Sequence, residues 1–180
     1  HYMNCHLFGK VNIGLRNTRL PNGTAVDLDA ECASYEAAIK KTGGIDFQLL
    51  GIGSNGHIGF NEPLSSLRSR TRVMTLSPAT ISQNKRYFEN PDMMPKRAIT
   101  MGVGTILESK RCLLLATGSA KAGVIARAVE GSVSSMVPAS ALQIHPRCAV
   151  ILDEAAAAGL SEKEYYRWFF DHEPEWAEYH

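Results

Sequence analysis

Short apolar segments alternate with helical patterns along most of this 180-residue chain, and this alternation restricts the folds open to it. Buried strands are predicted at residues 45–50 (IDFQLL), 111–116 (RCLLLA) and 148–152 (CAVIL), and further strands at 73–76 and 97–101. Strands that alternate with helices form parallel sheets covered on both faces. We therefore expect an α/β fold with an open, mostly parallel sheet and helices on both faces.

The helices are indicated by their start and stop signals. Helical spacing begins at Asp27 and stops at Gly43, and Ser77 is a predicted N-cap for a helix through Phe88. An apolar helix follows the TGSAK segment, and Ser161 with Glu164 forms a predicted capping box for a final aromatic helix. Residues 1–180 are predicted to form a single domain, with 155–180 as a C-terminal helical tail.

Composition limits the classes of partner. Nineteen Lys and Arg residues balance 18 Asp and Glu residues, so the chain has no basic field for nucleic acid or an anionic membrane. No apolar run reaches the length of about 20 residues that a membrane span needs, and the N-terminus lacks the apolar region of a secretory leader. The four cysteines contain no C-x-x-C pair, which favours reduced thiols in a cytoplasmic protein. Small molecules or further copies of the chain are the expected partners.

Residues 51–56 (GIGSNG) fit the G-x-G-x-x-G pattern of a dinucleotide-binding turn. That pattern requires a helix directly after the glycines and an acidic residue about 20 positions further on. Pro63 and Gly59 oppose such a helix, and the segment RTRVMTL, where the acidic residue belongs, contains none. The loop fails both requirements, and we expect no cofactor.

The same loop, 51–63, carries Asn55, His57, Asn61 and Glu62 at the end of a predicted strand, where ligands bind in open α/β sheets. Histidine suits proton transfer because its pKa lies near neutrality, and a nearby carboxylate stabilises its charged form. A lone histidine in a tight turn is more often structural, but this combination favours a functional site. A metal site is not expected, because no second His or Cys lies at ligand spacing.

Two further segments carry cations. The loop 117–121 places Lys121 at the start of a helix, where an anion site and an ordinary N-cap with a solvated lysine are equally consistent with the sequence. The segment NKRYF places Lys85 and Arg86 on a predicted helix, and these residues alone indicate a solvated face.

Longer motifs add a family resemblance. GIGSNGHIGFNEP, SSLRSRTRVMTL, NKRYF, AITMGVGTIL, ATGSAKA and AVEG occur in this order, and the chain from about 29 to 154 resembles the glucosamine-6-phosphate deaminase family. The resemblance implies the open α/β sheet of the deaminases, phosphogluconolactonases and pentose-phosphate isomerases. It also implies conversion of glucosamine 6-phosphate to fructose 6-phosphate and ammonia without a cofactor, by a homo-oligomer of three or six subunits.

The resemblance also suggests roles for individual residues. His57 matches the histidine that opens the sugar ring by moving a proton between the ring oxygen and the anomeric hydroxyl, and Glu62 matches the glutamate of its relay. Asn55 stands where some members have Asp, so the relay is expected to depend on Glu62. Arg86 and Lys121 match the residues that bind the substrate phosphate.

A second set of matches concerns activation. Ser65, Arg72 and Thr75 match positions that bind an activating N-acetylglucosamine 6-phosphate between subunits in some members. Met74 stands where those members have a lysine, so one phosphate contact of that site is missing from this sequence.

The resemblance begins after the first third of the family pattern. That third supplies a phosphate loop and the aspartate that moves a proton between the first two sugar carbons, and neither is found here. We expect impaired isomerisation if these residues are the whole molecule, and the usual enzyme if they are part of a longer chain. A 6-phosphogluconolactonase-like hydrolase and a non-catalytic sugar-phosphate-binding fragment or sensor are the alternatives.

Overall fold

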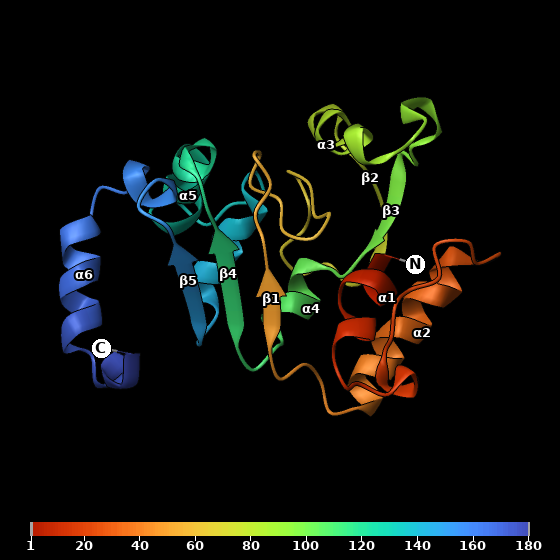
Figure 1. The fold of residues 1–180 in the computed structure, drawn as a ribbon, viewed down its shortest axis with the longest axis horizontal. Coiled ribbons are helices and arrows are strands. Elements are labelled where there is room, and N and C mark those ends of the chain that lie inside the picture. The colour runs from red at the N-terminus through yellow and green to blue at the C-terminus, as the bar shows by residue number, and fades with distance from the viewer. Residues whose placement is uncertain (1, 180) are drawn as a thin grey trace.

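The computed structural model describes residues 2–179 (Figure 1). The strands are β1 (Gln48–Leu50), β2 (Arg72–Thr75), β3 (Arg97–Thr100), β4 (Cys112–Ala116) and β5 (Cys148–Leu152). The α-helices are α1 (Tyr2–His6), α2 (Leu28–Lys41), α3 (Pro78–Asn84), α4 (Val103–Leu107), α5 (Ala122–Val129) and α6 (Lys163–His172). Short 3-10 helices are η1 (Phe8–Lys10), η2 (Leu15–Asn17), η3 (Lys85–Tyr87), η4 (Pro91–Met93), η5 (Ser119–Lys121), η6 (Pro138–Ile144), η7 (Ala156–Gly159) and η8 (Pro174–Tyr179).

A parallel sheet in the order β1-β4-β5 forms the centre of the molecule. Its register pairs Gln48 with Cys112 and Cys112 with Cys148. These strands are the three predicted as buried, which confirms the α/β class and the parallel sheet. β1 is shorter than the predicted strand 45–50, because only its last three residues join the ladder.

β2 and β3 form a separate antiparallel ribbon, with Arg72 opposite Thr100 and Thr75 opposite Arg97. Figure 1 shows this ribbon and α3 on one side of the parallel sheet. The connection from β1 to β4 therefore contains a loop, a ribbon and short helices in place of a single crossover helix. This connection positions α3 and η3 opposite the loop that follows β1.

The main core lies on one face of the parallel sheet. Leu50, Cys112 and Leu114 pack with residues of α5 and η6, and Ile125 is fully buried there. The opposite face differs from the expectation of helices on both sides: among the described residues its side chains Leu49, Leu115 and Ile151 are 59%, 47% and 51% exposed. The long β1–β4 connection explains the difference, because it folds beside the sheet and not across that face.

Two predicted helix starts are confirmed. The Asp27 carboxylate accepts from the N–H groups of Asp29 and Ala30 and caps α2, while Ser77 caps α3 by accepting from Thr80 N–H. Each side chain satisfies backbone donors that the first helical turn leaves unpaired.

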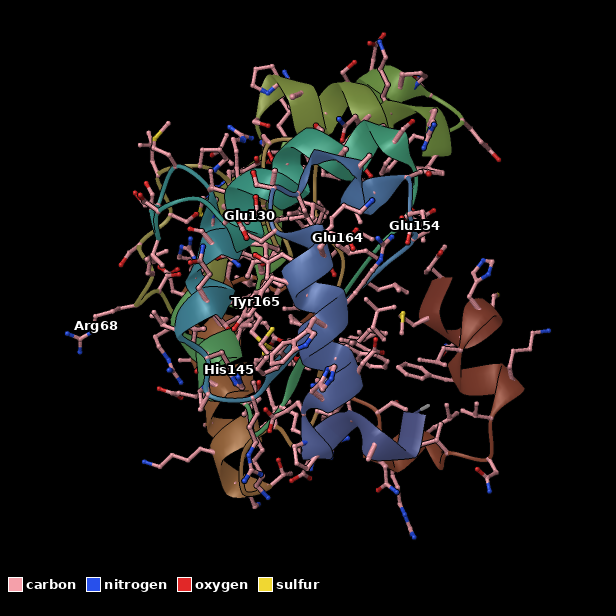
Figure 2. The ribbon with its side chains drawn as sticks, turned by 90° about the vertical axis from the view of Figure 1, so that its left-hand side faces the viewer. Arg68, Glu130, His145, Glu154, Glu164 and Tyr165 are labelled. Carbon is pink, nitrogen blue, oxygen red and sulfur yellow. The ribbon has the colours of Figure 1, made fainter. Side chains whose placement is uncertain are left out.

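The predicted capping box of the last helix is wrong. The N-cap of α6 is Glu162 without a side-chain cap, and Glu164 instead pairs with Arg167 at 2.7 Å. The N–H groups of Ser161 and Glu162 donate to the Glu130 carboxylate, so a distant acid does the work expected of the local box (Figure 2). No helix within residues 2–179 is both long and apolar enough to cross a lipid bilayer.

Candidate active site

The loop after β1 folds back on itself and brings its polar residues together. Gly53 N–H donates to the His57 carbonyl at 2.9 Å, and Gly56 turns the backbone at φ +89°, a value that favours glycine. The buried Ile58 anchors the far side of the turn in the core. The glycines therefore shape a side-chain site, in agreement with the rejection of a dinucleotide turn.

Gly53 has a second role, because the imidazole of His57 lies directly against its Cα. A Cβ at position 53 would lie 2.1 Å from His57 Cε1, well inside any real contact distance. By contrast, a Cβ at Gly51 would meet no atom within 4 Å. The second glycine of the motif thus provides the space that the histidine ring occupies.

Asn55 lies between His57 and Glu62. Asn55 Nδ2 donates to Glu62 Oε2 at 2.7 Å, and its Oδ1 lies 2.7 Å from His57 Nδ1, whereas the direct separation of His57 Nδ1 and Glu62 Oε2 is 3.7 Å. An ionised carboxylate only accepts hydrogen bonds, so it fixes the orientation of the Asn55 amide. The amide oxygen also only accepts, so the proton of the neutral imidazole is on Nδ1 and the lone pair is on Nε2.

Burial lowers the pKa of His57, and the positive charge of Lys121 acts in the same direction, while Glu62 opposes both. The ring is therefore neutral at neutral pH and presents a basic Nε2. Such a group is suited to accept and return a proton, which is the role predicted for His57.

Glu62 is buried and held in place by several donors. Burial acts to raise its pKa, but hydrogen bonds from the Thr80 side chain, Ser77 N–H and Asn55, together with His57, outweigh burial and lower the pKa. The Ser77 N–H donates at 3.1 Å from the start of α3. Glu62 thus stays ionised and joins the His57 loop to α3.

Asn61 fixes the same loop from the other side and is fully buried. Its Nδ2 donates to the carbonyls of Ile58 at 2.9 Å and Met101 at 2.8 Å, and its Oδ1 accepts from Arg72 Nη1 at 2.9 Å. Every hydrogen-bonding atom of this side-chain amide has a partner. Asn61 therefore ties the turn between His57 and Glu62 to Arg72 of β2 and to Met101, the residue after β3.

A cavity of about 380 Å³ lies beside this loop, and it is lined by His57, Arg86 and Lys121. Its other lining residues are Gly51, Ile52, Gly53, Gly59, Gln83, Asn84 and Tyr87. The structure thus brings together three residues from three separate segments that the sequence analysis singled out. Two cations face a common space with the basic histidine.

The two cations are held differently. Arg86 is exposed on η3, with its guanidinium 4.9 Å from the ring centre of Tyr87 and Nη2 donating to the Tyr87 hydroxyl at 2.9 Å. Lys121 is half-buried, and its Nζ donates to the Ile52 carbonyl at 2.7 Å. Because an ammonium carries three donors, this bond leaves donor capacity for an anionic ligand.

The loop 117–121 differs in part from its prediction. Gly118, at φ +87°, donates its N–H to both carboxylate oxygens of Asp153 at 3.0 Å. An internal carboxylate therefore occupies the backbone N–H of Gly118, which is not available to an external anion. Of residues 117–121, Lys121 is the one that lines the cavity.

Only two of the three residues predicted for activator binding are joined. Arg72 Nη2 donates to Ser65 Oγ at 3.0 Å, and burial lowers the pKa of this guanidinium. Thr75 is exposed at the end of β2, and its side chain makes no hydrogen bond to either residue in the described structure. Arg72 also donates to Asn61, which directly precedes Glu62 in the sequence. The Ser65–Arg72 pair is therefore linked through Asn61 to the loop that carries Glu62.

Two residues that hold Glu62, Ser77 and Thr80, were not predicted as site residues. The sequence identified Ser77 only as a helix cap, and nothing in the local pattern indicates that it faces a loop 15 residues earlier. Among residues 2–179, no three His, Cys, Asp or Glu side chains gather as a metal ion would require.

Comparison with known proteins adds the following similarities. A family model described as glucosamine-6-phosphate isomerases/6-phosphogluconolactonase matches residues 2–151. The chain is 54% identical over 167 residues to a glucosamine-6-phosphate deaminase from Shewanella loihica, covering 93% of this chain and 62% of that protein. It is 55% identical over 167 residues to a deaminase from Cellvibrio japonicus, covering 93% and 64%.

A solved structure of a glucosamine-6-phosphate deaminase, described as monomeric, superposes with a TM-score of 0.85 at 48% identity. The match covers 88% of this chain and 66% of that one. The chain thus spans slightly less than two thirds of the length of these relatives.

Proposed function

This chain belongs to the family of glucosamine-6-phosphate isomerases and 6-phosphogluconolactonases, and on that premise we propose that it provides the amino sugar phosphate site of a glucosamine-6-phosphate deaminase. The overall reaction converts glucosamine 6-phosphate and one water molecule to fructose 6-phosphate and ammonia without a cofactor. The observation that carries the proposal is the single cavity lined by His57, Arg86 and Lys121.

The two cations and the histidine act on opposite ends of the substrate. Arg86 and Lys121 bind the phosphate by charge, which holds the sugar in one orientation. His57 then acts at the other end of the substrate. Its Nε2 takes the proton of the anomeric hydroxyl and returns it to the ring oxygen, which opens the ring.

Asn55 and Glu62 support this proton transfer without touching the substrate. Asn55 keeps the proton on Nδ1, so that Nε2 is always the basic atom. When the ring becomes an imidazolium, the Glu62 carboxylate stabilises its charge from 3.7 Å. The relay is therefore a neutral amide between an imidazole and a carboxylate.

The later proton transfer between the first two sugar carbons needs a second base. None of the described residues that line the cavity is acidic, and the Glu62 carboxylate is already occupied by donors from α3 and Asn55. We assign that step to a part of the enzyme outside this cavity lining. The assignment agrees with a chain that spans under two thirds of its relatives.

Ammonia release tests the proposal. The chain is joined to the part of the Shewanella loihica relative outside the match, and this chimera is incubated with glucosamine 6-phosphate. We expect ammonia and fructose 6-phosphate in equal amounts. Hydrolysis of 6-phosphogluconolactone without ammonia would support the lactonase, and tight binding of glucosamine 6-phosphate without turnover would support the sensor.

The family resemblance predicts a trimer or hexamer, whereas the solved relative is described as monomeric. Sedimentation velocity over a range of concentrations separates these two expectations. We place the activity in the cytoplasm, where the thiols of Cys32, Cys112 and Cys148 stay reduced.

A further inference from the structure

The loop after β1 is bonded to both segments that carry the cations of the cavity. On one side Lys121 Nζ donates to the Ile52 carbonyl at 2.7 Å. On the other side Gln83 Nε2, near the end of α3, donates to Ser54 Oγ at 2.6 Å. Arg86 lies on η3, directly after α3. Both cations are therefore attached, through different segments, to one common loop.

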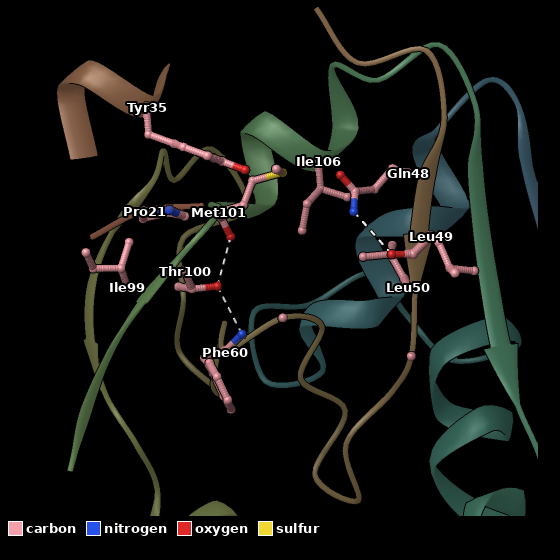
Figure 3. Close-up of a pocket in the computed structure, with 12 residues that line it drawn as sticks. Pro21, Tyr35, Gln48, Leu49, Leu50, Phe60, Ile99, Thr100, Met101 and Ile106 are labelled. Atoms are coloured by element: carbon pink, nitrogen blue, oxygen red, sulfur yellow. Dashed lines mark hydrogen bonds between the residues drawn. The ribbon is translucent and has the colours of Figure 1, made fainter. Parts of the chain in front are cut away.

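The loop is itself fixed to the rest of the fold. Figure 3 shows that Phe60 N–H donates to Thr100 Oγ1, at 3.0 Å, and that this hydroxyl donates in turn to the Met101 carbonyl, at 3.1 Å. Because Thr100 is the last residue of β3, these bonds join the loop to the antiparallel ribbon. Groups held in this way lose little freedom when a ligand binds, so the cavity is preorganised.

Tyr87 follows Arg86 on η3 and also lines the cavity. Both its ring and its hydroxyl contact the guanidinium: the central carbon of the guanidinium lies 4.9 Å from the ring centre, and Nη2 donates to the hydroxyl at 2.9 Å. None of the ion pairs within residues 2–179 involves Arg86. Tyr87 therefore orients this cation without neutralising its charge.

The chemistry of the two groups fixes the direction of their hydrogen bond. A guanidinium carries five donors and no acceptor, so the Tyr87 oxygen accepts and its own hydrogen is directed elsewhere. Within the described part of the chain the Tyr87 hydroxyl makes no other hydrogen bond. A hydrogen bond received from a cation polarises the O–H group and strengthens it as a donor. Tyr87 thus has an available donor beside an uncompensated positive charge.

We propose that the Tyr87 hydroxyl is a third ligand of the substrate phosphate, which donates to a phosphate oxygen while it accepts from Arg86. This role rests on the proposed function, in which Arg86 and Lys121 bind that phosphate. Phosphate oxygens accept hydrogen bonds from cations and from hydroxyl groups, so one phosphate can bind all three side chains. Tyr87 is 71% exposed, so its hydroxyl reaches an incoming phosphate without any displacement of packed side chains.

Tyr87→Phe removes the hydroxyl and keeps the ring beneath the guanidinium. The variant is made in the chimera, and calorimetric titration measures its affinity for inorganic phosphate and for glucosamine 6-phosphate. We expect both affinities to fall about tenfold, the usual effect of one hydrogen bond to a charged group, while ammonia release at saturating substrate stays unchanged. Tyr2→Phe is the matched control, since Tyr2 is 70% exposed on α1, and it should leave both affinities unchanged.

A spectroscopic measurement follows the hydrogen bond itself. The chemical shift of the Tyr87 Cζ atom, recorded with isotopically labelled tyrosine, responds to a change in the bonding of the attached hydroxyl. Addition of inorganic phosphate should move the Tyr87 resonance and leave that of Tyr2 in place. Potassium chloride at the same ionic strength should move neither resonance. A Tyr87 resonance that phosphate does not move would overturn the proposal.

Arg86→Ala separates this role from the phosphate site on which it rests. If Arg86→Ala retains full affinity for inorganic phosphate, the proposed phosphate site itself is wrong. If Arg86→Ala weakens binding and Tyr87→Phe does not, only the role of Tyr87 is overturned. The double variant should bind phosphate more weakly than Arg86→Ala alone. Equal affinity of the double variant and Arg86→Ala would show that the hydroxyl only positions Arg86, and would overturn its assignment as a ligand.

Discussion

Oδ1 of Asn55 lies 2.7 Å from Nδ1 of His57, and the amide of the same side chain donates to Glu62. A neutral residue therefore transmits the effect of the carboxylate to the imidazole. The hydrogen bond from His57 to Asn55 fixes the tautomer of the imidazole. The pKa of the imidazole is set by burial and by the charges of Lys121 and Glu62.

Asn55→Asp is expected to raise the pKa of His57, because it places a negative charge where a neutral oxygen now lies. It also removes the donor to Glu62 and brings two carboxylates together. A proton NMR titration of His57 Cε1–H measures the change. Asn90→Asp, at the exposed N-cap of η4, is the control and should leave the titration as it is. An unchanged pKa in Asn55→Asp would show that His57 does not contact this side chain.

Gly53→Ala is expected to displace the His57 ring, because the new Cβ would overlap it at 2.1 Å. We expect at least a tenfold loss of ammonia release in the chimera and a destabilisation of about 1–3 kcal/mol from overpacking. Gly123→Ala in α5 meets no atom within 4 Å and should be neutral or slightly stabilising. Unaltered His57 resonances in Gly53→Ala would contradict this packing.

The stability of the chain should depend on pH through His57. Its pKa is lowered in the folded state, so below about pH 6.5 the unfolded state binds its proton first and gains stability relative to the folded state. The free energy of unfolding should therefore fall as the pH drops from 7 to 5. Urea unfolding at several pH values measures this slope, and His57→Gln should make it shallower. A slope that His57→Gln does not alter would rule out this titration.

Glu62 acts in a lower window. Its pKa is also lowered, so it stabilises the fold above its unfolded pKa of about 4.3, and this contribution disappears as the pH falls through the folded value. Glu62→Gln should therefore change the free energy of unfolding mainly above pH 4. Comparing His57→Gln with Glu62→Gln therefore separates the contributions of His57 and Glu62 to the pH dependence of the free energy of unfolding.

Asn61→Leu is expected to destabilise the chain by about 2–3 kcal/mol, since it strands the carbonyls of Ile58 and Met101 and a contact of Arg72. It should also alter the His57 titration, because the turn that carries His57 and Glu62 loses its clamp. Gln143→Met is the control, since the Gln143 amide likewise donates to two carbonyls, those of Ala128 and Gly131, and neither acceptor belongs to the loop 51–63. If both variants lower stability and neither alters His57, Asn61 is only structural.

The sequence predicted the regular elements well and their arrangement less well. Ser77 caps its helix as expected, and α2 begins directly after Asp27 as its spacing predicted, because helix starts depend on neighbours within one turn. The capping box at Ser161 failed because Glu130, 31 residues earlier, supplies the carboxylate. The antiparallel ribbon and the open sheet face depend on long-range packing, which local periodicity does not encode.

The candidate site was likewise predicted in its individual residues but not in how they pack together. The family resemblance pointed to His57, Arg86 and Lys121, which line one cavity, and to Glu62. The residues alone suggested a functional loop at 51–63, left Lys121 open between an anion site and an ordinary N-cap, and indicated a solvated face for Lys85 and Arg86. The bridging position of Asn55 and the support from Thr80 required coordinates, since both depend on how α3 approaches the loop.

Calorimetric titration of the chimera with glucosamine 6-phosphate, combined with an ammonia assay, tests the division of labour in the cavity most directly. We predict that Arg86→Ala and Lys121→Ala each weaken binding at least tenfold, and that His57→Gln retains the affinity within a few-fold while ammonia release falls at least a hundredfold. Affinity that is unchanged in both cation variants, or lost together with turnover in His57→Gln, would contradict the account.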